Sequence, residues 1–292
     1  MTIFKNTYNV LIALSALAAS VPVSSCGPGA MDGDRTDGDG GVTATLTLRL
    51  FQPSPVTQTR AGSETLTDAN VLVLNSGGSA VGCAYLTGSP SSGTVKTRSG
   101  SSVTVCAVGN TGVAGYLDGV SSLSELKKKS VAVTAAAGVD PAKNGVLYGC
   151  SAADITVNSD GTTSPSHVDV KLNRLYSMFI YNITPSSGIT ILGYQICHVP
   201  LSSYVVPQAT SNPGGKFADF DLMHITSPVA GEKGTTGTYY MFENLQGTAA
   251  ASKDEKSRNS ANAPTDASYI NIYATDGTWT KTFRIYLGGL TT

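Results

Sequence analysis

The segment "VTATLTLRLF", residues 42–51, decides the fold class because its side chains alternate between apolar and polar along its length. One face carries the apolar residues Val42, Ala44, Leu46, Leu48 and Leu50. The other face carries Thr43, Thr45, Thr47 and Arg49. A side-chain period of two is typical of a β-strand, and an apolar face indicates that one side of the strand is buried. We therefore expect a strand at 42–51 that packs this face against a core.

Short segments with a similar pattern follow, separated by Gly, Pro, Asn and Asp turns. The strands predicted in the first half are residues 70–75, 80–86, 101–110, 131–135 and 145–150. Further strands are predicted within 168–172, 187–207, 239–247, 267–274 and 278–287. Many short strands between turn residues indicate an all-β protein built from β-sandwiches.

Helical periodicity is rare, and residues 121–129 are the one predicted helix. Ser122 and Glu125 have the spacing of a capping box, in which each residue satisfies a backbone N–H at the helix start. Two tight turns are predicted at Asp160-Gly161 and Asp276-Gly277, and the second is expected to join two strands into a hairpin.

The N-terminus has the layout of a secretory signal, with Lys5, an uncharged apolar run and small residues before Cys26. The apolar run is shorter than the roughly 20 residues of a membrane span. A Cys after small residues resembles a bacterial lipobox, which implies removal of residues 1–25 and acylation of Cys26. An ordinary signal peptide with an incidental Cys is the alternative.

Residues 27–41 are mostly Gly and Asp with almost no apolar side chain. Such a segment cannot bury enough surface to offset its ordering entropy, so we interpret residues 26–41 as the acylated Cys and a flexible tether. The Asp spacing does not match an EF-hand, because Thr36 and Thr43 stand at the fifth and twelfth loop positions.

Composition and motifs argue against an enzyme or a nucleic-acid-binding protein. The net charge is −1, and no basic patch with interleaved aromatic residues occurs. His167, His198 and His224 are dispersed along the sequence. The "GGK" at 214–216 does not complete a phosphate-binding loop, because position 210, where the first Gly is needed, is Thr. No catalytic residue, cofactor or metal site is predicted.

Four cysteines remain if Cys26 is acylated: Cys83, Cys106, Cys150 and Cys197. An even number in an exported protein permits two disulfides, with Cys83–Cys106 as one pairing that would tie two strands. Four buried thiols that pack as small apolar groups are an equal alternative.

The segment "YYMFENLQG" (239–247), followed by "ASYINIYA" (267–274), resembles the FimA-like fimbrial subunits of Bacteroidales, the fimbrilins of type V pili. The runs "VKLNRLYSMFIYNITP" (170–185) and "ICHVPLSSYVVP" (196–207) resemble the stretch that joins the two domains of those subunits. The resemblance implies two tandem transthyretin-like β-sandwich domains, at residues 42–172 and 173–292. It also implies a lipoprotein precursor in the outer membrane and later a cell-surface fimbrium that supports adhesion, with other fimbrial subunits as partners.

The segment "TRAGS" (59–63) resembles the site where an Arg-specific protease matures these subunits, between Arg60 and Ala61. Residues 42–60 would then be a removable strand and loop, and residues 42–51 would fill a groove in the first sandwich. Five inward apolar side chains contribute roughly 7–15 kcal/mol if fully buried. Arg35 and Arg49 are weaker candidates for cleavage.

Fimbrilins usually continue past the "YLG" of "FRIYLGGLTT" with a further strand that acts as donor, so the resemblance predicts either a truncated sequence or a subunit that accepts a strand without donating one. A surface glycan-binding lipoprotein of a polysaccharide-uptake system is the alternative function. Its binding platform would consist of Trp279, Tyr269, Tyr273 and Tyr286.

Overall fold

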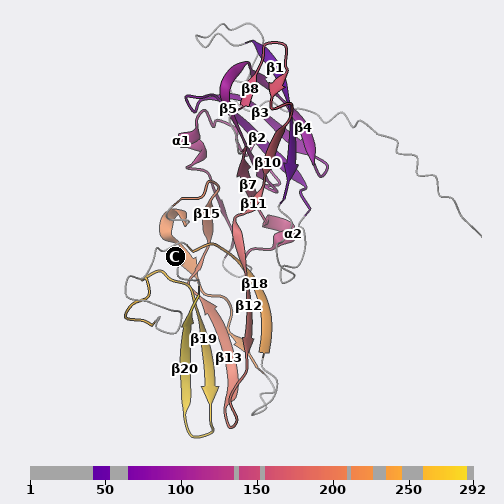
Figure 1. Cartoon of the computed structure of the whole chain (residues 1–292). Coiled ribbons are helices and arrows are strands. Elements are labelled where there is room, and N and C mark those ends of the chain that lie inside the picture. Colours follow the sequence, from indigo (N-terminus) through magenta and orange to yellow (C-terminus); the bar gives the residue numbers. More distant parts are fainter. Residues whose placement is uncertain are drawn as a thin grey trace, which may run out of the picture.

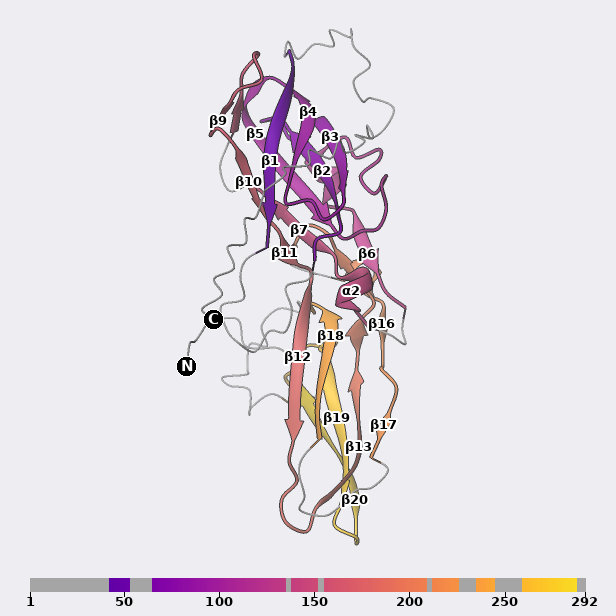
Figure 2. The same cartoon turned by 90° about the vertical axis from the view of Figure 1, so that its right-hand side faces the viewer.

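Two β-sandwiches stacked end to end form the elongated molecule seen in Figures 1 and 2. The computed structural model describes residues 42–52, 65–134, 138–151, 155–208, 212–225, 235–244 and 259–287. The predicted all-β fold is confirmed, because both cores lie between β-sheets and the described helices are single short turns.

The N-terminal sandwich packs a smaller sheet against a larger one. The smaller sheet, here the β1 sheet, has the order β10 (Val168–Lys171), β1 (Thr43–Phe51), β4 (Ser92–Arg98). The larger sheet has the order β11 (Asn173–Arg174), β7 (Leu147–Cys150), β5 (Gly100–Gly109), β2 (Asp68–Leu74), β3 (Ala80–Thr87). β8 (Ile155–Val157) pairs with β5, and β9 (Thr163–Ser164) pairs with β8.

The core of this sandwich lies between the two sheets. It combines alternate side chains of β1 with those of β2 and β5 on the facing sheet, such as Val71, Val73 and Val105. β2, in the larger sheet, is buried on both faces, because Leu72 and Leu74 point into a second cluster that includes the helix residue Leu126. Leu172 belongs to the first core, and the first strand of the other sandwich begins four residues later, at Tyr176.

The C-terminal sandwich packs a short sheet, here the β12 sheet, against a longer one, here the β19 sheet. The β12 sheet pairs β12 (Tyr176–Ile183) with β18 (Thr235–Phe242). The β19 sheet has the order β17 (Met223–His224), β13 (Thr190–Cys197), β19 (Tyr269–Thr275), β20 (Thr280–Tyr286). Tyr181, Met241, Ile196 and Ile270 come from both sheets and meet in one cluster.

A small pair of strands connects the two sandwiches. β15 (Ser202–Tyr204) returns from the C-terminal half and pairs with β6 (Ser130–Ala132) of the N-terminal half. Val205 and Val206 then pack into the N-terminal cluster that contains Leu126. β14 (Val199–Pro200) pairs with β16 (Phe217–Ala218), and a 3-10 turn, η1, covers Pro213–Gly215. The segment that connects the two sandwiches is therefore packed against the N-terminal sandwich.

The predicted helix and turns are present. α1 covers Leu123–Leu126, and Ser122 caps it by accepting a hydrogen bond from the Glu125 backbone N–H. The Glu125 carboxylate accepts from the Ser121 backbone N–H at 2.6 Å, one residue before the position of a standard capping box. Gly161 and Gly277 have φ of 83° and 92°, which a residue with a Cβ adopts only under strain.

Several elements had not been predicted, among them α2, β4 and the eight-residue β12 (Tyr176–Ile183). α2 (Pro141–Asn144) begins after Asp140, whose carboxylate accepts from the Ala142 backbone N–H at 3.0 Å. β4 lies in a stretch that is polar except for Val95. Its inward face is supplied by Val95 and Thr97, so the apolar alternation is too short to identify it.

The cysteine predictions need correction. Cys106 and Cys150 are opposite each other on β5 and β7 and form a disulfide. Cys83 lies on β3 and does not pair with Cys106, and Cys197 lies in the other sandwich, so neither the two-disulfide arrangement nor the four-thiol arrangement is correct. Burial raises the pKa of the Cys197 thiol to about 11, which keeps it protonated at neutral pH.

The disulfide gives a testable expectation about stability. It closes a loop with a sequence separation of 44 residues. Chain-entropy arguments assign such a loop about 4 kcal/mol of stabilisation. We expect a Cys106→Ala/Cys150→Ala variant to lose about that much free energy of unfolding in urea titrations. Parent protein treated with reductant is the control and should move by a similar amount. An unchanged parent under reductant would contradict the assignment.

Candidate functional site

β1 is the middle strand of its sheet although it is the first of the strands in the described residues. It pairs antiparallel with β4 from Thr43↔Arg98 to Arg49↔Ser92. On its other edge it pairs parallel with β10 from Leu48↔Val168 to Phe51↔Lys171. Removing β1 would therefore leave a slot bordered by the unpaired edges of two strands, which is a template for another strand.

The buried face of β1 fills the space between the two sheets. The structure places Ala44, Leu46, Leu48 and Leu50 at 5% exposure or less. The prediction that Val42 belongs to this buried face is wrong, because Val42 is 55% exposed and precedes the first strand residue. Its backbone still pairs with Ser99, through Ser99 N–H to Val42 O at 2.8 Å. Three leucines and one alanine, rather than five residues, thus form the groove-filling face.

The slot is apolar on its walls and floor. Val95 on β4 and Val170 on β10 flank the strand and are 1% exposed or less. The floor belongs to the same cluster as the β1 side chains and includes Val73 and Val105. Burying three leucine side chains contributes roughly 5–9 kcal/mol. This figure is an upper estimate because denatured chains already bury some apolar surface.

A charged pair lies at the C-terminal end of β1, on the exposed face of the sheet. Arg49 donates from Nε and Nη2 to the two carboxylate oxygens of Asp169, at 2.7 and 2.8 Å. His167 Nε2 is 2.9 Å from the same Nη2. The hydrogen bond from Arg49 holds the pKa of the Asp169 carboxyl below its ordinary value of 3.8. Both side chains are about half exposed, so the pair orients β1 against β10 more than it stabilises the fold.

The remaining predicted maturation residues fall outside the part of the chain that the structure describes. These are Cys26, Arg60 and Ala61, with the candidate Arg35. Gln52 is the last described residue after β1, and the description resumes at residue 65 before β2. Lipidation and cleavage therefore stay predictions.

The aromatic residues of the alternative glycan platform do not share one face. Arg284 lies over the Tyr269 ring at 3.9 Å, and Tyr286 meets the same ring edge-on, on the outer face of the β19 sheet. Trp279 packs instead against Phe283, whose side chain points to the opposite face of β20. No observation on the described residues favours that alternative.

The described residues contain no group of three or more His, Cys, Asp or Glu side chains that could hold a metal ion. Within the same residues, no helix has the length and hydropathy needed to span a membrane.

Comparison with known proteins gives the same fold. A domain of unknown function, DUF4906, matches residues 239–292. No curated protein sequence matches this chain. A putative cell adhesion protein from Bacteroides eggerthii DSM 20697 has a similar structure, with a TM-score of 0.57 at 14% identity over 84% of this chain and 79% of that one. At this identity the likeness establishes a shared fold.

Fimbrial proteins are also among the structural neighbours. A fimbrilin (FimA) from Porphyromonas gingivalis W83 matches with a TM-score of 0.48 at 13% identity, over 79% of this chain and 70% of that one. The fimbrial anchor protein Mfa2 from Porphyromonas gingivalis matches with a TM-score of 0.46 at 11% identity, over 84% and 82% of the two chains.

The two faces of β1 give a matched pair of variants. Leu46→Asp places a carboxylate at a site with 0% exposure, so we expect it to lower the free energy of unfolding by at least about 3 kcal/mol. Thr45→Asp lies on the exposed face opposite Lys96 and should stay within about 0.5 kcal/mol of the parent. Thermal unfolding of both purified variants beside the parent measures this difference. Equal, small effects would mean that β1 has no buried face.

The Arg49–Asp169 pair predicts a pH dependence. The pKa of Asp169 is lower in the folded state, so its contribution is present above the ordinary value of 3.8 and is lost as pH falls through the folded-state pKa. We expect the parent to exceed Asp169→Asn in thermal stability at about pH 6 and the two to converge in acid. A difference that stays constant over this range would show that the carboxylate charge is not responsible.

Proposed function

We propose that this chain is a structural fimbrial subunit whose first strand is removed so that a strand of another subunit can take its place. The observation that carries the proposal is the position of β1, which is central in its sheet, first among the described strands and apolar on one face. In this proposal residues 42–172 form the acceptor domain and residues 173–292 form the second domain. Its partners are other fimbrial subunits.

The location of β1 in the chain supports its removal. A middle strand with covalent connections on both sides could leave only if its neighbours also moved. β1 is linked to the described fold at one end only, through the segment between Gln52 and Thr65. A cut in that segment, at Arg60–Ala61, would convert the strand into a separate peptide without breaking β2 or any later strand.

Cleavage acts as a switch through effective concentration. A strand tied to its own slot by a short linker competes at an effective concentration on the order of millimolar. An incoming strand from another molecule cannot match that value. After the cut, the resident strand dissociates as a free peptide, and an incoming strand with equal apolar contacts then competes on even terms.

Export completes the proposed sequence of events. The chain travels as a lipoprotein acylated on Cys26 and stays in the outer membrane while β1 is in place. An Arg-specific protease then releases residues 61–292 to the cell surface, where the fimbrium supports adhesion. Strand exchange joins subunits without an enzyme active site, which agrees with the absence of catalytic motifs in the sequence.

Arg60→Ala tests the proposal in cells that carry the matching protease. We expect N-terminal sequencing of the surface form of the parent to begin at Ala61. The Arg60→Ala chain should stay full length and should not appear in high-mass polymers on size-exclusion chromatography. Arg35→Ala is the matched control, because it changes an arginine in the tether and should mature normally.

Two results would contradict the proposal. One is a surface form of the parent that still begins at acylated Cys26, because β1 would then remain attached. The other is normal polymer formation by the Arg60→Ala chain, because assembly would then not need release of the strand.

A further inference from the structure

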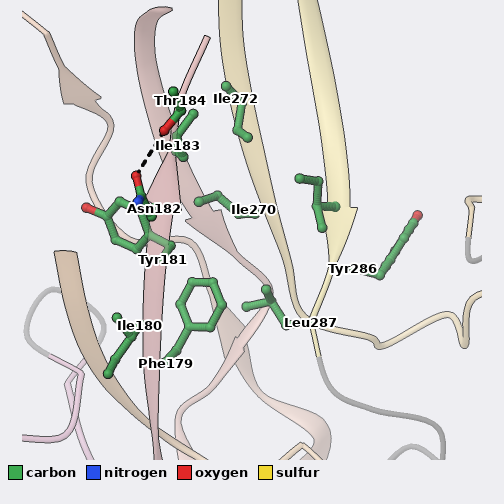
Figure 3. A pocket seen from close by; sticks show the side chains of 11 residues that line it. Phe179, Ile180, Tyr181, Asn182, Ile183, Thr184, Ile270, Ile272, Tyr286 and Leu287 are labelled. Atoms are coloured by element: carbon green, nitrogen blue, oxygen red, sulfur yellow. Dashed lines mark hydrogen bonds between the residues drawn. The ribbon is translucent and has the colours of Figure 1, made fainter. Parts of the chain in front are cut away.

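The C-terminal sandwich has an open apolar groove between β12 and β20, with a volume of about 570 Å³. Figure 3 shows Phe179 and Tyr181 from β12 beside Ile270 from β19, with Leu287 at one side of the space. None of the described residues that line it carries a formal charge at neutral pH. The groove is separate from the slot of β1, which lies in the other sandwich.

The inner face of β20 is uncovered along this groove. Ile285 is 53% exposed, whereas its neighbour in register on β19, Ile270, is 3% exposed. Phe283 is likewise 47% exposed beside Ile272 at 8%. The β12 sheet therefore covers the β19 row of this face and leaves the next row, on β20, open to water.

One edge of β12 runs along the groove with no partner strand among the described residues. β18 pairs with the other edge over the full length of β12, from Tyr176↔Phe242 to Ile183↔Thr235. The open edge and the uncovered row on β20 lie on two sides of the same space. Ile180 at this edge is 52% exposed. An added strand would hydrogen-bond to β12 and cover β20 together, as in β-strand addition at other sheet edges.

The size of the groove indicates whether its occupant is a single strand or the flat face of a folded protein. Phe283 and Ile285 are each about half exposed. At roughly 200 Å² for a large apolar side chain, they leave about 200 Å² uncovered. A stable interface between two folded faces buries about 800 Å² per partner, so the patch is too small for a dimer of such faces. A cavity of about 150 Å³ holds one benzene ring, so this groove has room for about four side chains of that size.

We propose that this groove binds the β1 segment, residues 43–51, of a second copy of the chain as a strand added to β12. The segment is extended, has three leucines and an alanine on one face, and carries its single charge, Arg49, on the other. Its length of nine residues matches the eight of β12. Phe51 is 44% exposed in its own slot and lies on the outer face, where it can pack beside Ile180.

The proposal rests on the proposed function in one respect, because it requires that β1 leave its own slot after cleavage. A released β1 peptide exposes three leucines to water and needs an apolar site. The second sandwich of a neighbouring subunit supplies one. If the peptide still carries its lipid at Cys26, a subunit that binds it stays attached to the membrane.

The test uses a fluorescent synthetic peptide of residues 42–52 and the full-length Arg60→Ala chain, in which tethered β1 keeps its own slot filled. We expect saturable binding by fluorescence anisotropy. A Phe283→Asp/Ile285→Asp chain should bind at least tenfold more weakly, and a peptide with Leu46→Asp and Leu48→Asp should not bind. Thr282→Asp, on the opposite face of β20, is the matched control and should bind like the parent. Circular dichroism confirms that each variant is folded, and hydrogen exchange should show new protection at the β12 amides when the peptide binds.

Failure of this inference differs from failure of the proposed function. No binding to the Arg60→Ala chain, or equal binding to the Phe283→Asp/Ile285→Asp chain, would overturn the groove assignment. The same would follow if the chain dimerised through Phe283 and Ile285 without peptide. If the peptide bound only to cleaved chain 61–292, and equally to its Phe283→Asp/Ile285→Asp variant, the peptide would occupy the β1 slot. The proposed function would then stand while this inference fell.

Discussion

The N-terminal sandwich depends on a strand that lies in the middle of a sheet and comes first among the described strands. β1 supplies the side chains that fill the space in front of Val73 and Val105, and its backbone joins β4 to β10. A middle strand is normally the least separable part of a sheet. Here its covalent connection to the described fold runs through one end, so a strand that fills the core is joined to the rest of the sandwich by a single segment.

The contacts of β1 divide into two kinds with different roles. The leucines supply most of the free energy, and any strand with similar apolar residues at alternate positions could supply the same. The bidentate contact of Arg49 with Asp169 is specific in geometry but lies in water, so it favours one register and orientation at small energetic gain. An exchangeable strand requires this division, because affinity must be shared by alternative occupants. The groove between β12 and β20 has similar chemistry without any resident strand in the described chain.

Alternation along residues 42–51 was enough to predict a strand with one buried face, because every second side chain is apolar. The same rule assigned Val42 to that face wrongly, since periodicity does not say where a sheet ends. It also missed β4, whose inward positions include Thr97, fully buried although polar. The Cys106–Cys150 pairing depends on β5 and β7 being neighbours, and strand order is a long-range property that local patterns do not contain. The exposure of Phe283 and Ile285 could not be predicted for a related reason. The pattern of "TKTFRIY" is that of any half-buried strand, and only the position of the facing sheet shows that its apolar face is uncovered.

The central claim is that β1 is a separable unit within a sandwich that otherwise persists. Residue-resolved amide hydrogen exchange before and after cleavage at Arg60 tests it most directly. In the intact chain, the account predicts that β1, β4 and β10 share the slow exchange of the core. After the cut, protection should fall in β1 and in the facing edges of β4 and β10, while β2 and β5 stay protected. Undiminished protection of β1, or a joint loss across β2 and β5, would contradict the account.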